Sequence, residues 1–369
     1  MLTRRDFAGG LALGASALST RALAQPTGDF APQTLGALAG RRGCLYGCAA
    51  TTFELRDHDF APLLAREAKI LVPEYEMKRA VLEPRPGAYD FDGADALSAF
   101  AQRTGMQFRG HTLVWHKANP PWLGAAIAAK PRDDFLVRYI HDVMSRYRGR
   151  VASWDVVNEA LAPEHGRRDA MRESLWLRAY GPDYIQAAFH AARAADPAAQ
   201  LVYNDWGCEA DGPKHDLFRA ATLDFLERMK ARGVPIDAYG MQGHLQAFGA
   251  KVDQRKLRIF LERLDALGLR ILVTEHDVDD SGGPTDVSLR DRAVADASRR
   301  FLDVVLDNRA TTAVLTWGLS DRFLDPPGLR ARLAGYSPRL LPLDSNLQRK
   351  PMWWAMAGSF SGMRPSLAN

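Results

Sequence analysis

The chain has 369 residues, with 48 Lys and Arg against 44 Asp and Glu, a formal charge of +4, 47% hydrophobic residues and three cysteines. This composition is typical of a folded soluble protein and excludes disordered, collagen-like and disulfide-scaffold classes. The basic residues are dispersed among nearly as many acidic ones, so nothing indicates a nucleic-acid partner.

The first residues are typical of an export signal. The pair Arg4-Arg5 precedes a short apolar Gly/Ala/Leu run, and a small-residue Ala-x-Ala exit ends at Ala24. This order predicts a twin-arginine signal peptide over residues 1–24, although a plain N-terminal helix is the alternative. We therefore expect a periplasmic or secreted protein. The apolar run is too short to span a bilayer, so we expect no membrane partner after cleavage. We also expect residues 25–369 to form a monomer.

Short apolar runs alternate with longer segments that have helical spacing. The runs are rich in Val, Ile, Leu and Tyr, which favours strands. Eight strands with intervening helices predict the α/β class, as a (β/α)8 TIM barrel that forms a single domain over residues 25–369. A doubly wound open sheet is the alternative, but no glycine-rich nucleotide loop opens a helix. The predicted strands are 44–49, 70–72, 108–115, 153–158, 201–204, 238–242, 271–274 and 313–317.

Polar and aromatic residues gather where these predicted strands end. Barrels of this kind build their sites at the C-terminal ends of the strands. One polar strand end is commonplace, because turns into helices favour Asn and Asp. Seven polar or aromatic strand ends in succession indicate a functional site. They are Pro73-Glu74, Gly110-His111 through Trp115-His116, Asn158-Glu159, Asn204-Asp205-Trp206, Gln242-Gly243-His244, Glu275-His276-Asp277 and Trp317.

Two glutamates directly follow apolar strands on opposite sides of the predicted barrel. Glu159 follows the fourth strand and Glu275 the seventh. Two carboxyl groups that flank a glycosidic bond can act as proton donor and nucleophile. Strand periodicity places Asp277 on the side of Glu275, and a hydrogen-bonded chain with His244 is expected to hold Glu275 ionised. Apolar neighbours favour the protonated form of Glu159, so we assign it the proton.

Four tryptophans lie at or just beyond the predicted strand ends. Their indoles offer flat faces on which a sugar can stack, although Trp also packs in ordinary cores. Their concentration at one face favours a carbohydrate groove. They are Trp115, Trp122, Trp206 and Trp317.

Several segments together resemble the serial motifs of glycoside hydrolase family 10. Their order and spacing match that family from about Leu45 to Lys350-Pro351, which covers nearly all of the mature chain. Five ordered motifs in one frame make a specific signal. The motifs are 109–116 (RGHTLVWH), 154–159 (WDVVNE), 203–205 (YND), 242–245 (QGHL) and 274–278 (TEHDV).

The resemblance implies an endo-1,4-β-xylanase that cleaves xylan with retention, through a covalent glycosyl-enzyme intermediate and without metal or cofactor. Glu159 resembles the family's acid/base, Glu275 its nucleophile, and Asn158 the residue that contacts the 2-hydroxyl at the cleavage point. Retention predicts carboxyl groups about 5 to 5.5 Å apart. The positions that match substrate-binding residues of the family are Glu74, Lys78, His111, Trp115, Asn204, Gln242 and Trp317.

The chain departs from the family pattern at several positions. Tyr75 stands where Asn is usual, Arg79 where Trp is usual, and His276 where Leu is usual. A second Trp that commonly follows the last motif is missing from 321–325. Because the catalytic pair is retained, we expect an active retaining glycosidase whose groove is modified on the glycone side.

Three alternatives compete with this assignment, and the sequence argues against the metal-dependent one. A retaining glycosidase of this fold could act on another β-glycan, on xylo-oligosaccharides or on aryl xylosides, because the fold and the two carboxyl groups do not select the sugar. A metal-dependent barrel hydrolase would need paired His ligands at the first strand, and residues 44–49 contain no His. A non-catalytic carbohydrate-binding relative would explain altered subsites, although both glutamates are present.

The remaining Cys and His residues receive simpler interpretations. We interpret Cys44 and Cys48 as small core residues and leave Cys208 unassigned. Five histidines are expected in surface or capping positions away from the strand ends. They are His58, His141, His165, His190 and His215.

Overall fold

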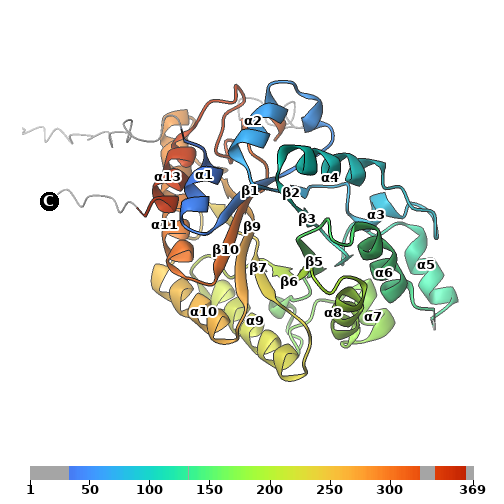
Figure 1. Ribbon diagram of the computed structural model, residues 1–369. Coiled ribbons are helices and arrows are strands. Elements are labelled where there is room, and N and C mark those ends of the chain that lie inside the picture. The colour runs from blue at the N-terminus through green and yellow to red at the C-terminus, as the bar shows by residue number, and fades with distance from the viewer. Residues whose placement is uncertain (1–32, 132, 325–336, 363–369) are drawn as a thin grey trace, which may run out of the picture.

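The computed structural model describes residues 33–131, 133–324 and 337–362, and the predicted signal peptide lies outside these ranges. Parallel strands form a barrel that helices surround (Figure 1). The strands are β1 (Leu45–Ala50), β2 (Ile70–Pro73), β3 (Gln107–Gly110), β4 (Val114–Trp115), β5 (Ser153–Asn158), β6 (Gln200–Asp205), β7 (Ala238–Met241), β8 (His244–Gln246), β9 (Arg270–Asp279) and β10 (Thr311–Thr316).

The ladder closes on itself. β10 pairs with β1 on one side and with β9 on the other. β3 and β4 both pair with β5, and β7 and β8 both pair with β9, so each of these pairs is one interrupted barrel strand. Eight strand positions result, and the predicted (β/α)8 barrel is confirmed. The interruptions, at 111–113 and 242–243, were not predicted.

Twelve described helices lie in chain order between or beside the strands, and several start at side chains that cap them. The carboxylate of Asp134 accepts from the backbone N of Val137 at 2.8 Å, and Asp253 and Asp286 cap later helices in the same way. The helices are α1 (Leu35–Arg41), α2 (Phe60–Glu67), α3 (Arg79–Leu82), α4 (Asp92–Thr104), α5 (Trp122–Ala129), α6 (Phe135–Tyr147), α7 (Leu175–Tyr180), α8 (Tyr184–Ala195), α9 (Pro213–Ala231), α10 (Gln254–Ala266), α11 (Val287–Asp307) and α13 (Pro351–Phe360).

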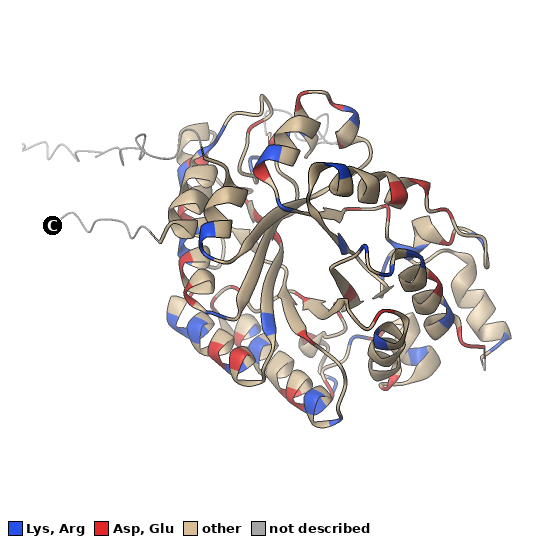
Figure 2. Ribbon diagram, in the orientation of Figure 1, with Lys and Arg blue, Asp and Glu red and all other residues tan. Residues whose placement is uncertain are grey.

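Three short 3-10 helices complete the described elements: η1 (Glu54–Arg56), η2 (Pro163–His165) and η3 (Asp321–Phe323). Lys and Arg are interspersed with Asp and Glu over the outer helices (Figure 2). In the described part of the chain, no helix is both long and apolar enough to cross a bilayer.

Alternate residues of the strands form two separate apolar clusters. On β9, Leu272 belongs to a small cluster, whereas Ile271 and Val273 belong to the large core that includes residues of the surrounding helices. This alternation follows from the two-residue period of a strand, with one face inside the barrel and one outside. Trp317 packs against the small cluster, so apolar side chains lie beneath the site.

All three cysteines are buried free thiols, which confirms the core interpretation of Cys44 and Cys48. Cys208 is also in the core and lies 3.5 Å from the hydroxyl of Tyr239.

Candidate active site

A cavity of about 800 Å³ opens at the C-terminal ends of the strands and contains both predicted catalytic glutamates. Glu74 and Asn204, which were predicted to bind substrate, are not part of its lining. The other predicted site residues all line it. They are Lys78, His111, Trp115, Asn158, Gln242, His244, Asp277 and Trp317.

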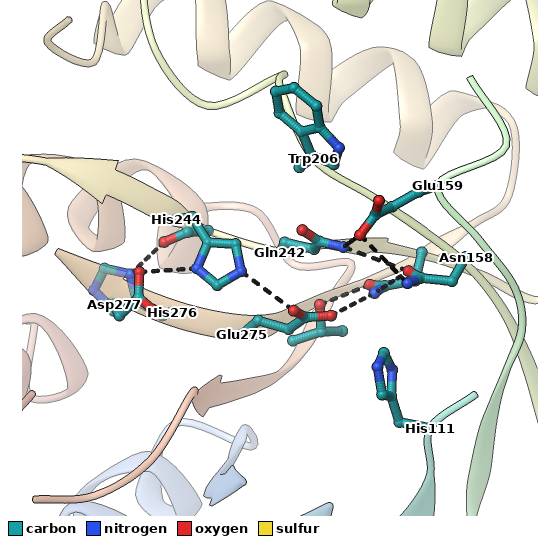
Figure 3. A network of polar contacts seen from close by, with 12 residues as sticks. His111, Asn158, Glu159, Trp206, Gln242, His244, Glu275, His276 and Asp277 are labelled. Atoms are coloured by element: carbon teal, nitrogen blue, oxygen red, sulfur yellow. Dashed lines mark hydrogen bonds and ion pairs between the residues drawn. The ribbon is translucent and has the colours of Figure 1, made fainter. Parts of the chain in front are cut away.

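Glu275 lies on β9 and is only 6% exposed. Its Oε1 accepts from Asn204 Nδ2 at 2.8 Å, and its Oε2 faces His244 Nε2 at 3.2 Å. The other ring nitrogen of His244 faces Asp277 Oδ1 at 2.8 Å. The predicted hydrogen-bonded chain of Glu275, His244 and Asp277 is present in the structure (Figure 3).

The charges along this chain stabilise an ionised Glu275. Burial alone would raise the pKa of Glu275, but the hydrogen bond from His244, the electrostatic effect of His111 and the bond from Asn204 outweigh it and lower the pKa. Burial would likewise lower the pKa of His244, but the carboxylates of Asp277 and Glu275 raise it well above its usual value. His244 is therefore an imidazolium that donates to a carboxylate from each nitrogen.

Glu159 directly follows β5 and has a φ of 55°, a left-handed conformation that costs a non-glycine residue about 1–2 kcal/mol. Main-chain contacts hold it there. Its N donates to the carbonyl of Asn204 at 2.9 Å, and its own carbonyl accepts from Arg172 Nε at 2.9 Å. Arg172 also donates to the carbonyl of Leu161 at 2.9 Å, so this one side chain fixes the turn after β5.

The carboxyl oxygens of Glu159 have different surroundings. Oε1 accepts from Gln242 Nε2 at 3.2 Å and from Asn158 Nδ2 at 3.5 Å. Oε2 lies 3.8 Å from Nδ1 of His116, a nitrogen that has no hydrogen-bond partner among the described residues. Burial, together with the charges of Arg172 and Lys117, lowers the pKa of His116 to about 4. A neutral imidazole therefore stands beside Oε2.

Amide side chains connect the two glutamates. Asn158 Oδ1 accepts from Asn204 Nδ2 at 2.9 Å and from Gln242 Nε2 at 3.4 Å. The rotated Asn158 amide would place its oxygen 3.2 Å from Trp115 Nε1. We assign the first orientation, because the Asn204 nitrogen that bonds the Glu275 carboxylate must meet an oxygen and not a second NH2 group.

Asn204 has no exposed surface and acts on Glu275 from beneath the cavity. Its Oδ1 accepts from Thr274 Oγ1 at 2.7 Å. A Cβ on Gly240 would come within 2.3 Å of that same oxygen, so the absence of a side chain at Gly240 leaves room for the amide. Asn204 therefore orients the nucleophile candidate in this structure.

Two sides of the cavity are distinguished by their aromatic residues. On one side, Lys78 Nζ lies 5.3 Å from the ring of Trp115 and 5.8 Å from that of Trp317. His111 contacts Trp317 edge to face at 5.3 Å. Trp206 lies beyond Glu159, on the opposite side of the glutamate pair from His111 (Figure 3).

A hydrogen bond orients His111, and burial changes the pKa of Lys78. The Nδ1 of His111 faces Asp155 Oδ2 at 2.9 Å, which leaves Nε2 for a substrate. Arg109 pairs with the other oxygen of Asp155. Burial lowers the pKa of Lys78, and the carboxylates of Glu74, Glu275 and Glu159 only partly offset this effect.

Several cavity residues were missed by the sequence analysis. Glu209 accepts from the backbone N of Gly207 at 2.8 Å and of Gly243 at 3.1 Å, so it ties together the turns after β6 and β7. His215 was expected away from the site, and this is wrong, because it lines the cavity and its Nδ1 lies 2.8 Å from the carbonyl of Gly207. Both residues lie beyond a strand end, where strand periodicity gives no signal.

Two departures from the family pattern do not alter the groove, which corrects the expectation. Arg79 is 3% exposed, pairs with Glu83 and stacks 4.2 Å from the ring centre of Tyr139. His276 is fully buried and faces outward from β9, where it contacts Ser298 and Phe301 of α11. Of the three substituted positions, only Tyr75 is exposed. Trp122 also lies outside the cavity lining, and its Nε1 donates to the carbonyl of Glu83 at 3.1 Å.

His276 supports the turn between β7 and β8. Its Nδ1 lies 2.9 Å from the carbonyl of Gly243 and its Nε2 lies 2.9 Å from Ser298 Oγ. Burial lowers the pKa of His276 to about 4, so the ring is neutral. Because a carbonyl can only accept, Nδ1 carries the proton and Nε2 accepts from Ser298. Within the described ranges, no group of three or more His, Cys, Asp or Glu is placed to hold a metal ion.

A family model described as Glycosyl hydrolase family 10 matches residues 34–359. The chain belongs to this family. A relative named endo-1,4-beta-xylanase B, from Thermotoga neapolitana, is 36% identical over 293 residues, which cover 79% of this chain and 80% of the relative.

Solved structures of this family share the fold. The crystal structure of native xylanase 10B from Thermotoga maritima matches with a TM-score of 0.76 at 32% identity, over 89% of this chain and 98% of that one. Xylanase 10B from Thermotoga petrophila RKU-1, solved in complex with xylobiose, matches with a TM-score of 0.76 at 31% identity, over 89% and 97% of the two chains.

The pKa of Glu275 should depend on His244. We expect His244→Ala to raise the pKa of Glu275, because the substitution removes a donor and a positive charge that oppose the effect of burial. Carboxyl titration by NMR on glutamate labelled in the side chain measures this shift. Asp277→Asn, which retains the imidazole, should give a smaller rise. An unchanged pKa in His244→Ala would contradict the role given to this chain.

His276 should act as a positioning residue for the turn that carries Gln242 and His244. We expect His276→Leu to lower the free energy of unfolding by about 1–3 kcal/mol, the cost of an unpaired buried carbonyl, and to lower kcat on an aryl β-glycoside. His276→Asn, whose amide can donate near the position of Nδ1, should recover most of kcat. Equal kcat values for the two variants would contradict a positioning role.

Proposed function

We propose that this family 10 glycoside hydrolase is a retaining endo-1,4-β-xylanase that hydrolyses internal β-1,4-xylosidic bonds of xylan. The observation that carries the proposal is the pair of glutamates in one cavity, with Glu275 bound to an imidazolium and Glu159 accepting from the amides of Gln242 and Asn158. The names of the relatives support xylan as the substrate. The environments of the two carboxyl groups support different roles.

The first step is attack by the ionised Glu275 on the anomeric carbon. As that bond forms, the glycosidic carbon–oxygen bond breaks, and the leaving oxygen takes the proton of Glu159. Amide NH groups on Glu159 Oε1 favour an unprotonated oxygen there, so the proton is carried on Oε2. The leaving sugar lies on the Glu159 side, towards Trp206, and the glycone lies towards Lys78 and Trp317.

The second step reverses the roles. Glu159, now ionised, accepts a proton from water while the water oxygen attacks the same carbon and releases Glu275. We expect Asn158, which lies between the two glutamates, to contact the 2-hydroxyl of the sugar there, where such bonds strengthen in the transition state. The cation of His244 remains beside Glu275 and favours its departure as a carboxylate.

Replacing each of the two glutamates by Ala should reduce turnover in a different way. Glu275→Ala should abolish turnover of both xylan and an aryl β-xylobioside, because no intermediate can form. Glu159→Ala should lose xylan hydrolysis by several orders of magnitude but still form the intermediate from a substrate whose leaving group needs no proton. Initial rates and burst kinetics measure the difference.

The unmodified protein provides the control for this experiment. On a panel of β-glycans it should hydrolyse xylan best, and proton NMR should detect the β-anomer of the product first. Inversion would contradict the nucleophile assignment, preference for another glycan would contradict the substrate, and binding without turnover would contradict catalysis.

We also propose that the protein is exported through the twin-arginine route. The pair Arg4-Arg5 and the small-residue exit that ends at Ala24 support this proposal. A reporter fused to residues 1–24 should reach the periplasm of a bacterial host, and replacing both arginines by Lys should retain it in the cytoplasm. Export that survives the double substitution would contradict the route.

A further inference from the structure

The exposed aromatic residues of the described chain are concentrated on the catalytic face. Eight large hydrophobic residues are exposed in the described ranges, and all three aromatic ones follow the C-terminal end of a strand. Phe53 follows β1, Tyr75 follows β2 and Phe248 follows β8. The aliphatic ones lie on helices: Val81 on α3, which begins directly after Lys78, and Leu217, Ile259, Val287 and Leu289 on α9, α10 and α11.

Phe53 and Tyr75 are presented by two neighbouring loops that share one carboxylate. Glu76, 8% exposed, accepts from the backbone N of Thr52 at 2.6 Å through one oxygen and from the backbone N of Tyr75 at 3.3 Å through the other. Phe53, which follows Thr52, is 70% exposed, and Tyr75 is 55% exposed. Both rings are therefore carried by backbone that the fold holds in place.

Further contacts hold the ring of Phe53. Phe323 of η3 contacts it edge to face at 6.5 Å and is itself packed on Phe60 at 4.8 Å. Arg322 pairs with Asp57 at 2.8 Å, which ties η3 to the loop after β1. Phe53 thus has a supported edge and an exposed face, an arrangement suited to binding and not required for packing.

Tyr75 connects this surface to the cavity. Lys78 Nζ lies 4.6 Å from the ring centre of Tyr75 and also faces Trp115 and Trp317, which line the cavity. The aromatic surface therefore begins where the glycone side of the cavity ends. Tyr75 is also the exposed position at which the chain departs from its family, with an aromatic ring in place of Asn.

We propose that Phe53 and Tyr75 form an outer glycone-binding surface on which sugars of the β-1,4-linked substrate stack beyond those held at Lys78 and Trp317. Chemistry and continuity favour this occupant. The CH faces of pyranose sugars bind to flat aromatic rings, and a polymer cleaved at an internal bond must leave the cavity along this side. A partner protein is a poorer fit, because the exposed area of two rings is far smaller than the roughly 1,000 Å² that a specific protein interface buries.

The inference rests on the proposed function, and its test uses substrate length. Initial rates are measured on xylo-oligosaccharides of two to six sugars labelled at the reducing end, with an aryl β-xyloside as the single-sugar glycone. Phe53→Ala and Tyr75→Ala should lower kcat/KM on the longest substrates by roughly 3- to 10-fold and shift cleavage towards products with fewer glycone sugars. Phe53→Ala should leave the aryl xyloside rate within about twofold of the unmodified rate, the range expected for a surface substitution.

Matched variants separate stacking from other effects. Tyr75→Phe retains the ring and removes the hydroxyl that bonds Glu74, so it should preserve the dependence on length. Ile259→Ala removes an apolar side chain that is 50% exposed on α10, against 70% for Phe53 and 55% for Tyr75, and it should leave the rates on all substrates unchanged. A uniform fall on all substrates, or no fall on the longest, overturns the inference.

Failure of the inference can be distinguished from failure of the proposed function. If the unmodified protein does not hydrolyse xylo-oligosaccharides, xylanase activity is wrong, and the same length series is run with the β-glycan that it does hydrolyse. Calorimetry with the Glu275→Gln variant and the longest oligosaccharide measures binding without turnover. Weaker binding after Phe53→Ala in that background supports the surface, and unchanged binding overturns it.

Discussion

A buried ionised carboxylate is the constraint on which the site depends. Removing a charge from water costs several kcal/mol unless partners compensate for it, and Glu275 is only 6% exposed. Asn204 and His244 each bind one of its oxygens, and Asp277 keeps His244 protonated. The nucleophile candidate is thus held as an anion by groups whose own positions come from three different barrel strands.

Regular barrel geometry alone does not produce this arrangement. The ladder is interrupted after β3 and after β7, and the residues in these gaps, His111 and Gln242, are those that turn into the cavity. Glu159 requires a left-handed backbone, and Arg172 and the carbonyl of Asn204 hold it there. Irregular backbone occurs where the chemistry needs side chains aimed inward, and neighbouring loops supply its support.

The sequence predicted the parts of the site that follow from strand periodicity. Apolar runs located the strands, and the spacing of two residues placed Glu275 and Asp277 on the same side. That side is the inner one because of a register shift between Val273, which faces outward, and His276, and the sequence did not predict this shift. Glu209 and Arg172 could not be predicted, because they reach the site from segments beyond a strand end and act on backbone atoms that only the folded loops bring near. The same period could have corrected His276, since a residue between two inward-facing neighbours must face the outer helices.

The distribution of the family departures follows from how tightly each position is constrained. His276 and Arg79 are buried, and protein atoms bind both ring nitrogens of His276 and the Nε and one terminal nitrogen of Arg79. Such changes are confined to the supporting structure. At Tyr75 the ring is 55% exposed and contacts Lys78, while Glu76 fixes the backbone beneath it. A substitution at Tyr75 can therefore change the surface beside the cavity while Asn204 and His244 still bind Glu275.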